Sequence, residues 1–191
     1  MIIIAGKYKG RKLSMPKGSQ TRPTSSRLRE ALFNICQHVI EGASFIDIFA
    51  GSGAMGFEAL SRGAKSVTFI DSHIHAIQAI KQNATQLGVE SQCQIMKGDF
   101  LSILSLLERK KALYDIIYAD PPYFTGTHEQ VEGLSTKLIR WIDTHQLLKA
   151  GGTLFIEENF HYQPQLNDFT TLSLQDSRKM GPAVLQQYIV D

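Results

Sequence analysis

Cysteines and long apolar runs are scarce in this chain, and each shortage excludes a class of protein. The 191 residues include two cysteines, Cys36 and Cys93, which stand far apart and match no zinc-binding spacing. We therefore expect buried free thiols in a reducing cytoplasm. No apolar run reaches the roughly 18 residues of a membrane span. The apolar residues 2–5 are too few for the core of a signal peptide.

Motifs for metal binding and for serine catalysis are missing as well. The six histidines are scattered through the chain, and none stands in an H-E-x-x-H motif. No serine has the G-x-S-x-G setting of a hydrolase nucleophile. The sequence therefore predicts no metal site, no membrane contact and no serine hydrolase. Its length predicts a single main domain with a substantial core.

A net charge of +2 hides an uneven distribution of charge along the chain. Residues 1–30 carry eight basic side chains and one acid, whereas residues 31–191 carry 12 basic and 17 acidic side chains. Such a basic segment is typical of a protein that binds a polyanion, and the alternative is a solvated face without a partner. Gly6 and Gly10 are expected to keep the segment flexible along a phosphate backbone. The side chains expected to contact nucleic acid are Lys7, Lys9, Arg11, Lys12, Arg22 and Arg27.

Strand-like and helix-like segments alternate after this basic start. Residues 1–15 predict a β-hairpin with its turn at 6–10, within an arm of residues 1–20 that precedes a domain of residues 21–191. Strands are predicted before the glycines of residues 51–53 and at 66–70, 92–97, 114–119 and 153–157, with helices between them. A final hairpin is predicted from strands at 169–174 and 184–190. This alternation favours a parallel, doubly wound α/β sheet.

A glycine-rich turn joins the first strand of this domain to a helix. Asp47 stands near the carboxyl end of the strand, and Gly51-x-Gly53-x-x-Gly56 follows. Glycine permits positive φ and close approach of a ligand to the backbone. The start of the helix also presents N–H groups that have no partner within the helix. In open α/β sheets ligands bind at the carboxyl ends of the strands, so this turn predicts a cofactor site.

Two cofactors fit the glycine pattern. It satisfies the dinucleotide fingerprint, and Asp71 follows at the position expected of a ribose-binding acid. Asp47, however, would repel a pyrophosphate, and its carboxylate suits the cationic amino group of S-adenosylmethionine. A tight turn without a ligand is the third interpretation.

The sequence Asp120-Pro121-Pro122-Tyr123 follows the apolar strand predicted at 114–119. Two prolines end a strand abruptly and fix the direction of the Pro121 carbonyl. A carboxylate and a fixed carbonyl can accept both hydrogens of an exocyclic amine, while a tyrosine ring holds the base flat. The motif therefore indicates methylation of a nucleobase amine, driven mainly by positioning. The alternative is a proline turn that merely ends a strand.

Five segments carry a resemblance to a known family: residues 22–24 (RPT), 29–35 (REALFNI), 47–53 (DIFAGSG), 58–64 (EALSRGA) and 120–123 (DPPY). They resemble the RsmD family of bacterial methyltransferases, which use S-adenosylmethionine to methylate N2 of guanine 966 in 16S rRNA. The resemblance implies a Rossmann-like class I S-adenosylmethionine-dependent methyltransferase with a seven-stranded mixed sheet. The last strand would be antiparallel, and a basic N-terminal β-hairpin would precede the domain.

The resemblance also implies residue roles and partners. The target guanine would be held by Asp120, Pro121 and Tyr123. Within the cofactor site, Asp71 would bind the ribose, and Asp99 with Phe100 the adenine. Asp71 and Asp99 could instead cap helices, and Phe100 could belong to the core. The full set expected at the cofactor is Asp47, Phe49, Gly51, Gly53, Asp71, Asp99, Phe100, Arg22 and Thr24.

The expected partner is 16S rRNA in the 30S subunit or an assembly intermediate, bound by a cytoplasmic monomer. Three other functions remain open from the residues alone. Adenine-N6 and other amino-methyltransferases share the Asp-Pro-Pro-Tyr motif. An NAD-binding Rossmann oxidoreductase would share the glycines, and an RNA-binding module could retain the site without activity.

Overall fold

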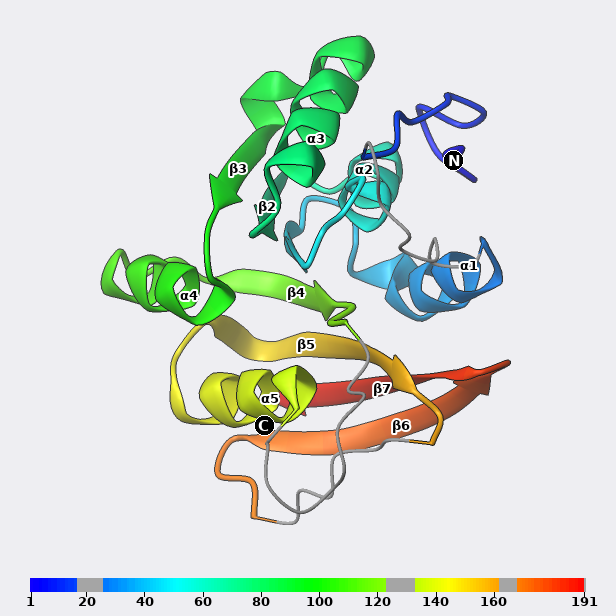
Figure 1. Ribbon diagram of the computed structural model, residues 1–191. Coiled ribbons are helices and arrows are strands. Elements are labelled where there is room, and N and C mark those ends of the chain that lie inside the picture. Colours follow the sequence, from blue (N-terminus) through cyan, green and yellow to red (C-terminus); the bar gives the residue numbers. More distant parts are fainter. Residues whose placement is uncertain (17–25, 123–132, 162–167, 191) are drawn as a thin grey trace.

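The computed structural model describes residues 1–16, 26–122, 133–161 and 168–190. These residues form one seven-stranded sheet in the order β3-β2-β1-β4-β5-β7-β6 (Figure 1). Strands β1 to β5 pair in parallel, and β7 runs antiparallel to β5. The predicted mixed sheet with an antiparallel last strand is therefore confirmed.

The boundaries of the elements follow the predicted alternation. The strands are β1 (Ser44–Ile48), β2 (Ser66–Asp71), β3 (Cys93–Lys97), β4 (Tyr114–Ala119), β5 (Leu148–Asn159), β6 (Leu172–Met180) and β7 (Ala183–Val190). The α-helices are α1 (Ser26–Ile35), α2 (Ala54–Ser61), α3 (Ile74–Leu87), α4 (Phe100–Arg109) and α5 (Leu134–Thr144). Short 3₁₀ turns follow α1 at Cys36–His38 and precede β3 at Glu90–Gln92.

Helices cover both faces of the sheet. Side chains alternate between the faces of a strand, so Phe45 of β1 packs in the layer of α1, α2 and α3, while Ile46 packs against α4 and α5. Buried apolar residues therefore fill two cores, one on each side of the sheet. This explains why β4 is apolar along nearly its whole length, as a central parallel strand should be.

The N-terminal arm is more irregular than the predicted hairpin. One antiparallel bridge joins Ile2 to Lys12, and no regular strand forms in residues 1–16. Backbone hydrogen bonds nevertheless join the two sides of the arm: the Arg11, Ile3 and Met1 carbonyls accept the N–H groups of Ile3, Gly10 and Leu13 at 3.0, 2.9 and 2.9 Å. The buried Glu58 carboxylate of α2 accepts the next N–H groups, those of Ile4 and Ala5, at 2.8 and 3.0 Å. The predicted hairpin is thus present as a short pairing that is anchored to α2.

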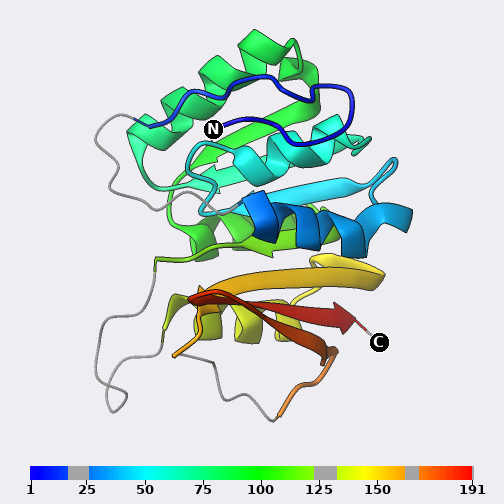
Figure 2. The same cartoon turned by 90° about the vertical axis from the view of Figure 1, so that its right-hand side faces the viewer.

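The described part of the arm is fixed to the domain, contrary to the expected flexibility. It passes over α2 and α3 (Figure 2). The Ser61 carbonyl accepts the N–H of Lys7 at 2.7 Å, and Asn83 both accepts from and donates to the Ser14 backbone. At Gly6 a Cβ would lie 1.8 Å from the Ser61 carbonyl oxygen, so the close approach requires glycine. The arm is built onto the same helices that follow the glycine loop and β2.

The last hairpin differs from the prediction in its length. Strands β6 and β7 are joined tightly at Gly181 and Pro182, whereas a connection over residues 175–182 was expected. Strand β6 lies at the edge of the sheet, and its second half is mostly exposed and polar. An edge strand needs no apolar pattern, which is why the sequence did not reveal its full length.

The cysteines, the helices and the potential metal ligands of the described residues bear on three further predictions. Both cysteines are free; Cys36 is buried as expected, but Cys93 is only partly buried. None of the helices described is long and apolar enough to cross a membrane. Within the same residues, no cluster of three potential metal ligands is found.

Candidate active site

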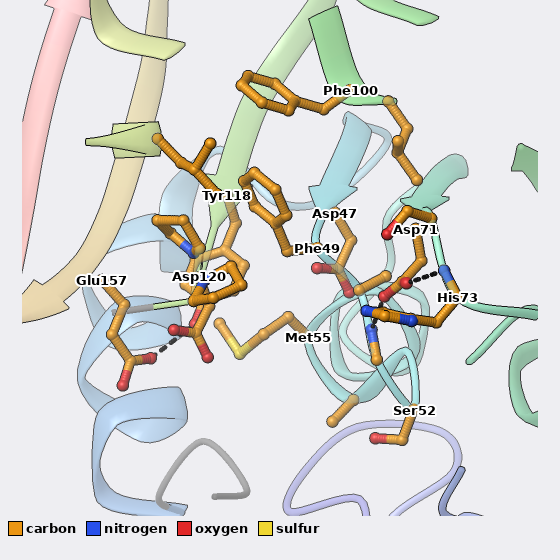
Figure 3. Close-up of a pocket in the computed structure, with 18 of the residues that line it drawn as sticks. Asp47, Phe49, Ser52, Met55, Asp71, His73, Phe100, Tyr118, Asp120 and Glu157 are labelled. Carbon is orange, nitrogen blue, oxygen red and sulfur yellow. Dashed lines mark hydrogen bonds between the residues drawn. The ribbon is translucent and has the colours of Figure 1, made fainter. Parts of the chain in front are cut away.

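A pocket of about 480 Å³ opens at the carboxyl ends of the parallel strands. The loops after β1 to β4 contribute to its walls, together with Glu157 of β5 (Figure 3). The β6–β7 hairpin and Met1 and Met15 of the arm line it as well. The order of the strands reverses between β1 and β4, which is the position where open α/β sheets bind ligands. The two loops that carry the sequence motifs therefore meet at one pocket.

Four neighbouring strands each bring a carboxylate to this pocket. Asp71 ends β2, Asp47 lies in β1, Asp120 directly follows β4, and Glu157 lies in β5. By strand alternation all four belong to the face of the sheet that carries Tyr118. In Figure 3, Asp120 and Glu157 occupy one end of the pocket, and Asp47 and Asp71 the other. The site is thus acidic from end to end.

Asp47 is buried, and few polar groups among the described residues compensate for the loss of water around its carboxyl group. Its side chain is 2% exposed and accepts the Gly56 N–H at 2.9 Å. Burial raises the pKa of Asp47 to about 8; the Gly56 hydrogen bond opposes this shift, and the nearby Asp71 adds to it. A cationic group placed beside Asp47 would relieve this cost.

Asp71 closes the glycine loop from the neighbouring strand. Its Oδ2 accepts the Gly51 N–H at 2.9 Å, and its Oδ1 accepts the N–H of His73, the N-cap residue of α3, at 2.8 Å. Asp71 thus bonds the residue before the first turn of α3, but it does not cap the helix, because the N-cap residue is His73. Asp71 also lines the pocket, so a ribose-binding role stays a prediction.

The three glycines of the motif differ in what they do. Gly51 has φ 55° and lines the pocket. Gly53, expected at the cofactor, is the N-cap residue of α2 with φ 77° and is not among the lining residues. A Cβ at Gly53 would lie 2.7 Å from Phe57, and one at Gly56 would lie 2.3 Å from Phe69. These two glycines let α2 pack closely on β2.

Two aromatic rings form part of the pocket wall. Phe49 has φ 63°, a left-handed conformation that is rare for a bulky residue. Its ring lies 5.0 Å from that of Phe100, centroid to centroid. Phe100 is buried at the start of α4 and also lines the pocket. Asp99 caps α4 by accepting the Ser102 N–H at 3.0 Å, so the capping interpretation is correct, although Asp99 reaches the pocket as well.

The Asp-Pro-Pro segment borders the pocket beside the glycine loop. Asp120 is partly buried, Pro121 is buried, and both line the pocket. The Asp120 N–H lies 3.4 Å from the Ile48 carbonyl oxygen, which ties the end of β4 to β1. Tyr123, Arg22 and Thr24 lie outside the described residues.

Sequence reasoning left Glu157 without a role. This side chain is 6% exposed, lines the pocket and accepts the hydroxyl hydrogen of Tyr118 at 2.7 Å. The available signal was an acid at the end of an apolar strand, but the neighbouring strand had to be known to place it. Met55 was missed in the same way and lies near the middle of the pocket (Figure 3).

The predicted basic surface is largely present. Lys7, Lys9, Arg11 and Lys12 are exposed on the arm, and Arg27 is exposed on α1. Arg29, counted in the basic segment, is instead 1% exposed. Its guanidinium donates to the Ile2 carbonyl at 3.0 Å and lies 3.7 Å from the Glu58 carboxylate. Arg29 therefore holds the arm in place and does not belong to the surface.

Known proteins share both the sequence and the fold. The family model described as Conserved hypothetical protein 95 matches residues 1–189. Ribosomal RNA small subunit methyltransferase D of Buchnera aphidicola subsp. Acyrthosiphon pisum is 33% identical over 156 residues, which span 82% of this chain and 76% of that protein. The chain belongs to the RsmD family. The Escherichia coli strain K12 protein of the same name is 37% identical over 132 residues, spanning 69% of this chain and 65% of that protein.

Solved structures agree with this RsmD-family fold. The Escherichia coli protein yhhF gives a TM-score of 0.80 at 29% identity and covers 100% of this chain and 98% of its own. An RNA methyltransferase from Salinibacter ruber, solved with S-adenosyl-L-homocysteine, gives a TM-score of 0.64 over 88% and 94% of the two chains. At 10% identity the second likeness concerns the fold alone. The predicted Rossmann-like class I methyltransferase fold is confirmed.

Proposed function

We propose that this RsmD-family protein methylates N2 of a guanine in 16S rRNA, with S-adenosylmethionine as the methyl donor. Family resemblance suggests guanine 966 as the target. The observation that carries the proposal is the meeting, in one pocket, of the Asp47 glycine loop and the Asp120-Pro121 segment. The first suits a cationic cofactor, and the second suits an amine substrate. Relatives named as small-subunit rRNA methyltransferases support the same function.

The pocket fits S-adenosylmethionine better than a dinucleotide. A pyrophosphate needs backbone N–H donors at the glycine loop. In this loop the N–H groups of Gly51, Gly53 and Gly56 are already bonded, to Asp71, the Ala50 carbonyl and Asp47 respectively. An anion would meet carboxylates in their place. The charge of the site thus argues against the NAD-dependent oxidoreductase.

Named residues would hold each part of the cofactor. Asp47 would face the cationic amino group, Asp71 would accept from the ribose hydroxyls, and the rings of Phe49 and Phe100 would pack against the adenine. When bound, S-adenosylmethionine supplies a methyl group on a positively charged sulfur. The acidic pocket favours this charge over that of an anion.

Asp120 and Pro121 would hold the reacting base. The Asp120 carboxylate and the Pro121 carbonyl accept the two hydrogens of the guanine amine, which turns the nitrogen lone pair toward the methyl group. Transfer of the methyl group would form an N–C bond as the S–C bond breaks, with S-adenosylhomocysteine as the leaving group. One surplus proton then remains on N2, and Asp120 can accept it or pass it to water. Positioning supplies most of the acceleration, because the methyl group is already activated.

The basic arm would bind the RNA backbone. Its exposed lysines stand on a segment fixed to α2 and α3, and Met1 and Met15 of the same segment line the pocket. A fixed arm would therefore guide the phosphates at a constant distance from the site. Its contribution to affinity should not depend on RNA sequence and should weaken with salt.

The test is transfer of labelled methyl groups from S-adenosylmethionine to undermodified 30S subunits, free 16S rRNA and DNA, followed by digestion to nucleosides. We expect label in N2-methylguanosine. Label in N6-methyladenine would replace the proposal by its closest alternative, and no transfer to any substrate would contradict it. Mapping of the labelled nucleotide decides whether it is guanine 966.

A further inference from the structure

We infer that Glu157 recognises the target base, by accepting a hydrogen bond from N1–H of the guanine. This inference rests on the proposed function and adds to it a residue that chooses between bases. The Asp120-Pro121 segment grips an exocyclic amine, which guanine, adenine and cytosine all possess. Selection of guanine therefore requires a further contact on the edge of the ring.

The position of Glu157 follows from the sheet register. Ala119 of β4 pairs with Ile156 of β5, so the next residues along the two strands, Asp120 and Glu157, are neighbours. Paired parallel strands lie about 4.8 Å apart, which is close to the width of one hydrogen-bonding edge of a base. Figure 3 shows both carboxylates at the same end of the pocket.

The Glu157 carboxylate is held in this position by Tyr118. Tyr118 is 1% exposed, and its hydroxyl donates to Glu157 Oε2 at 2.7 Å. A carboxylate can accept from several donors at once, so the Tyr118 bond orients the group without exhausting its acceptor capacity. The hairpin residues Pro182 and Ala183 line the pocket beside it and reduce its contact with water.

The chemistry of the base edges then decides the preference. Guanine presents an N1–H donor next to its N2 amine, and a carboxylate accepts from such donors. Adenine presents an N1 lone pair next to its N6 amine, which a carboxylate would repel. Glu157 would thus favour guanine and reject adenine, while Asp120 holds the nitrogen that reacts.

Glu158 supplies a matched control one residue away. It points to the other face of the sheet, where Ser135 of α5 donates to its carboxylate at 2.6 Å. It is buried like Glu157, and it does not line the pocket. Glu158→Gln therefore makes the same chemical change in the same strand without reaching the base.

The experiment compares wild type, Glu157→Gln and Glu158→Gln on rRNA that carries guanine or 2-aminopurine at the mapped target. 2-Aminopurine keeps the amine but has a lone pair at N1. Glu157→Gln should lower kcat/KM for guanine by about 10- to 100-fold and shift the preference toward 2-aminopurine, because an amide can donate to that lone pair. Glu158→Gln should keep the wild-type preference.

Each outcome separates the inference from the proposed function. The role of Glu157 would be overturned if the ratio of kcat/KM for guanine to that for 2-aminopurine did not change in Glu157→Gln, or if it changed equally in Glu158→Gln. Either result would leave the proposed methyltransferase function intact. Failure of wild type to methylate any guanine N2 would instead overturn the function. Binding of S-adenosylhomocysteine verifies that each variant is folded. If Glu157→Gln does not fold, equal wild-type rates on the two bases overturn the inference.

Discussion

Two buried aspartates, Asp47 in the pocket and Asp143 at the end of α5, have pKa values that are shifted in opposite directions. Their side chains are 2% and 4% exposed. Burial raises the pKa of Asp47 to about 8. Burial would raise the pKa of Asp143 too, but hydrogen bonds from the Thr171 backbone, from the hydroxyl and backbone of Thr170 and from the Leu172 backbone lower it to about 2.

The difference separates a structural carboxylate from one suited to a ligand. Asp143 is saturated by donors from the start of β6 and fixes the edge of the sheet. Within the described residues, Asp47 receives a single hydrogen bond, from Gly56. The pKa shifts are opposite because Asp47 lies deeper in the protein than Asp143 and because it has one hydrogen-bond donor where Asp143 has several. A poorly compensated carboxylate in a pocket is typical of a functional site.

The largest effect should come from the pocket carboxylate nearest the substrate. Asp120→Ala should lower turnover by on the order of 10²- to 10³-fold, because the amine loses a preorganised acceptor. The affinity for S-adenosylhomocysteine, measured by calorimetry, should stay close to that of wild type. Asp115→Ala, at the other end of β4, is the control and should keep turnover. Normal turnover in Asp120→Ala would remove Asp120 from the mechanism.

Loss of the saturated carboxylate should affect stability. Asp143→Asn should lower the free energy of unfolding by about 2 kcal/mol at pH 7, because the donors then face a neutral amide in place of the carboxylate. Because the folded pKa is depressed, this stabilisation is present above about pH 4 and is lost as the pH falls through about 2. Urea titrations should show that the difference in free energy of unfolding between wild type and variant becomes smaller as the pH is lowered from 7 to 3.

Asp176→Asn serves as the matched control for this aspartate. Asp176 forms an exposed ion pair with Arg178, and such pairs contribute little to stability. A gap for Asp143→Asn that does not change with pH would contradict the assigned cause of its stabilisation.

Asp47→Asn should change stability in the opposite direction to Asp143→Asn, with its stabilising effect growing as the pH rises. The folded pKa of Asp47 is raised, so this group makes the ligand-free wild type less stable as the pH rises from about 4 to 8. The variant lacks this penalty and should melt at a higher temperature than wild type at pH 8, with the gain vanishing near pH 4. Its affinity for S-adenosylmethionine should nevertheless fall about 10-fold. A variant that is less stable at pH 8 would contradict the assigned effect of burial on Asp47.

The smallest effect should come from the exposed arm. Lys9→Ala combined with Lys12→Ala should weaken RNA binding a few-fold and reduce the slope of log K against log salt by about 1 for each phosphate that the variant no longer neutralises. Stability should not change, because buried Glu58 and Arg29 fix the arm. Filter binding at several salt concentrations provides the measurement. Lys110→Ala with Lys111→Ala, after α4, is the control pair; an equal decrease there would argue against the arm.

Much of this fold was predictable because local sequence patterns encode it. Residues 114–119 were predicted and found as a strand, since an apolar run ends abruptly at two prolines. The glycine loop at the pocket followed from glycines and an acid at the end of a strand. The predicted N-terminal β-hairpin is present only as a short pairing with its turn near residues 6–10, and its attachment to Glu58, far along the chain, was not predictable from local sequence.

The details of the site depended on packing that no local pattern contains. Gly53 matched the motif, but a Cβ there would also clash with Phe57 and Phe69, which only the packing of α2 reveals. No residue near Phe49 in the sequence predicts its positive φ. Glu157 lines the pocket because β5 lies next to β4, and strand order is a property of the whole sheet.

Asp47 should stay protonated until a cationic ligand binds, because burial raises its pKa to about 8. Calorimetric titration with S-adenosylmethionine at pH 7, in buffers of different ionisation enthalpy, measures the protons released on binding. We predict that wild type releases more than about half a proton per site, and that Asp47→Asn releases less by about that amount. Equal proton release by the two proteins would contradict the account.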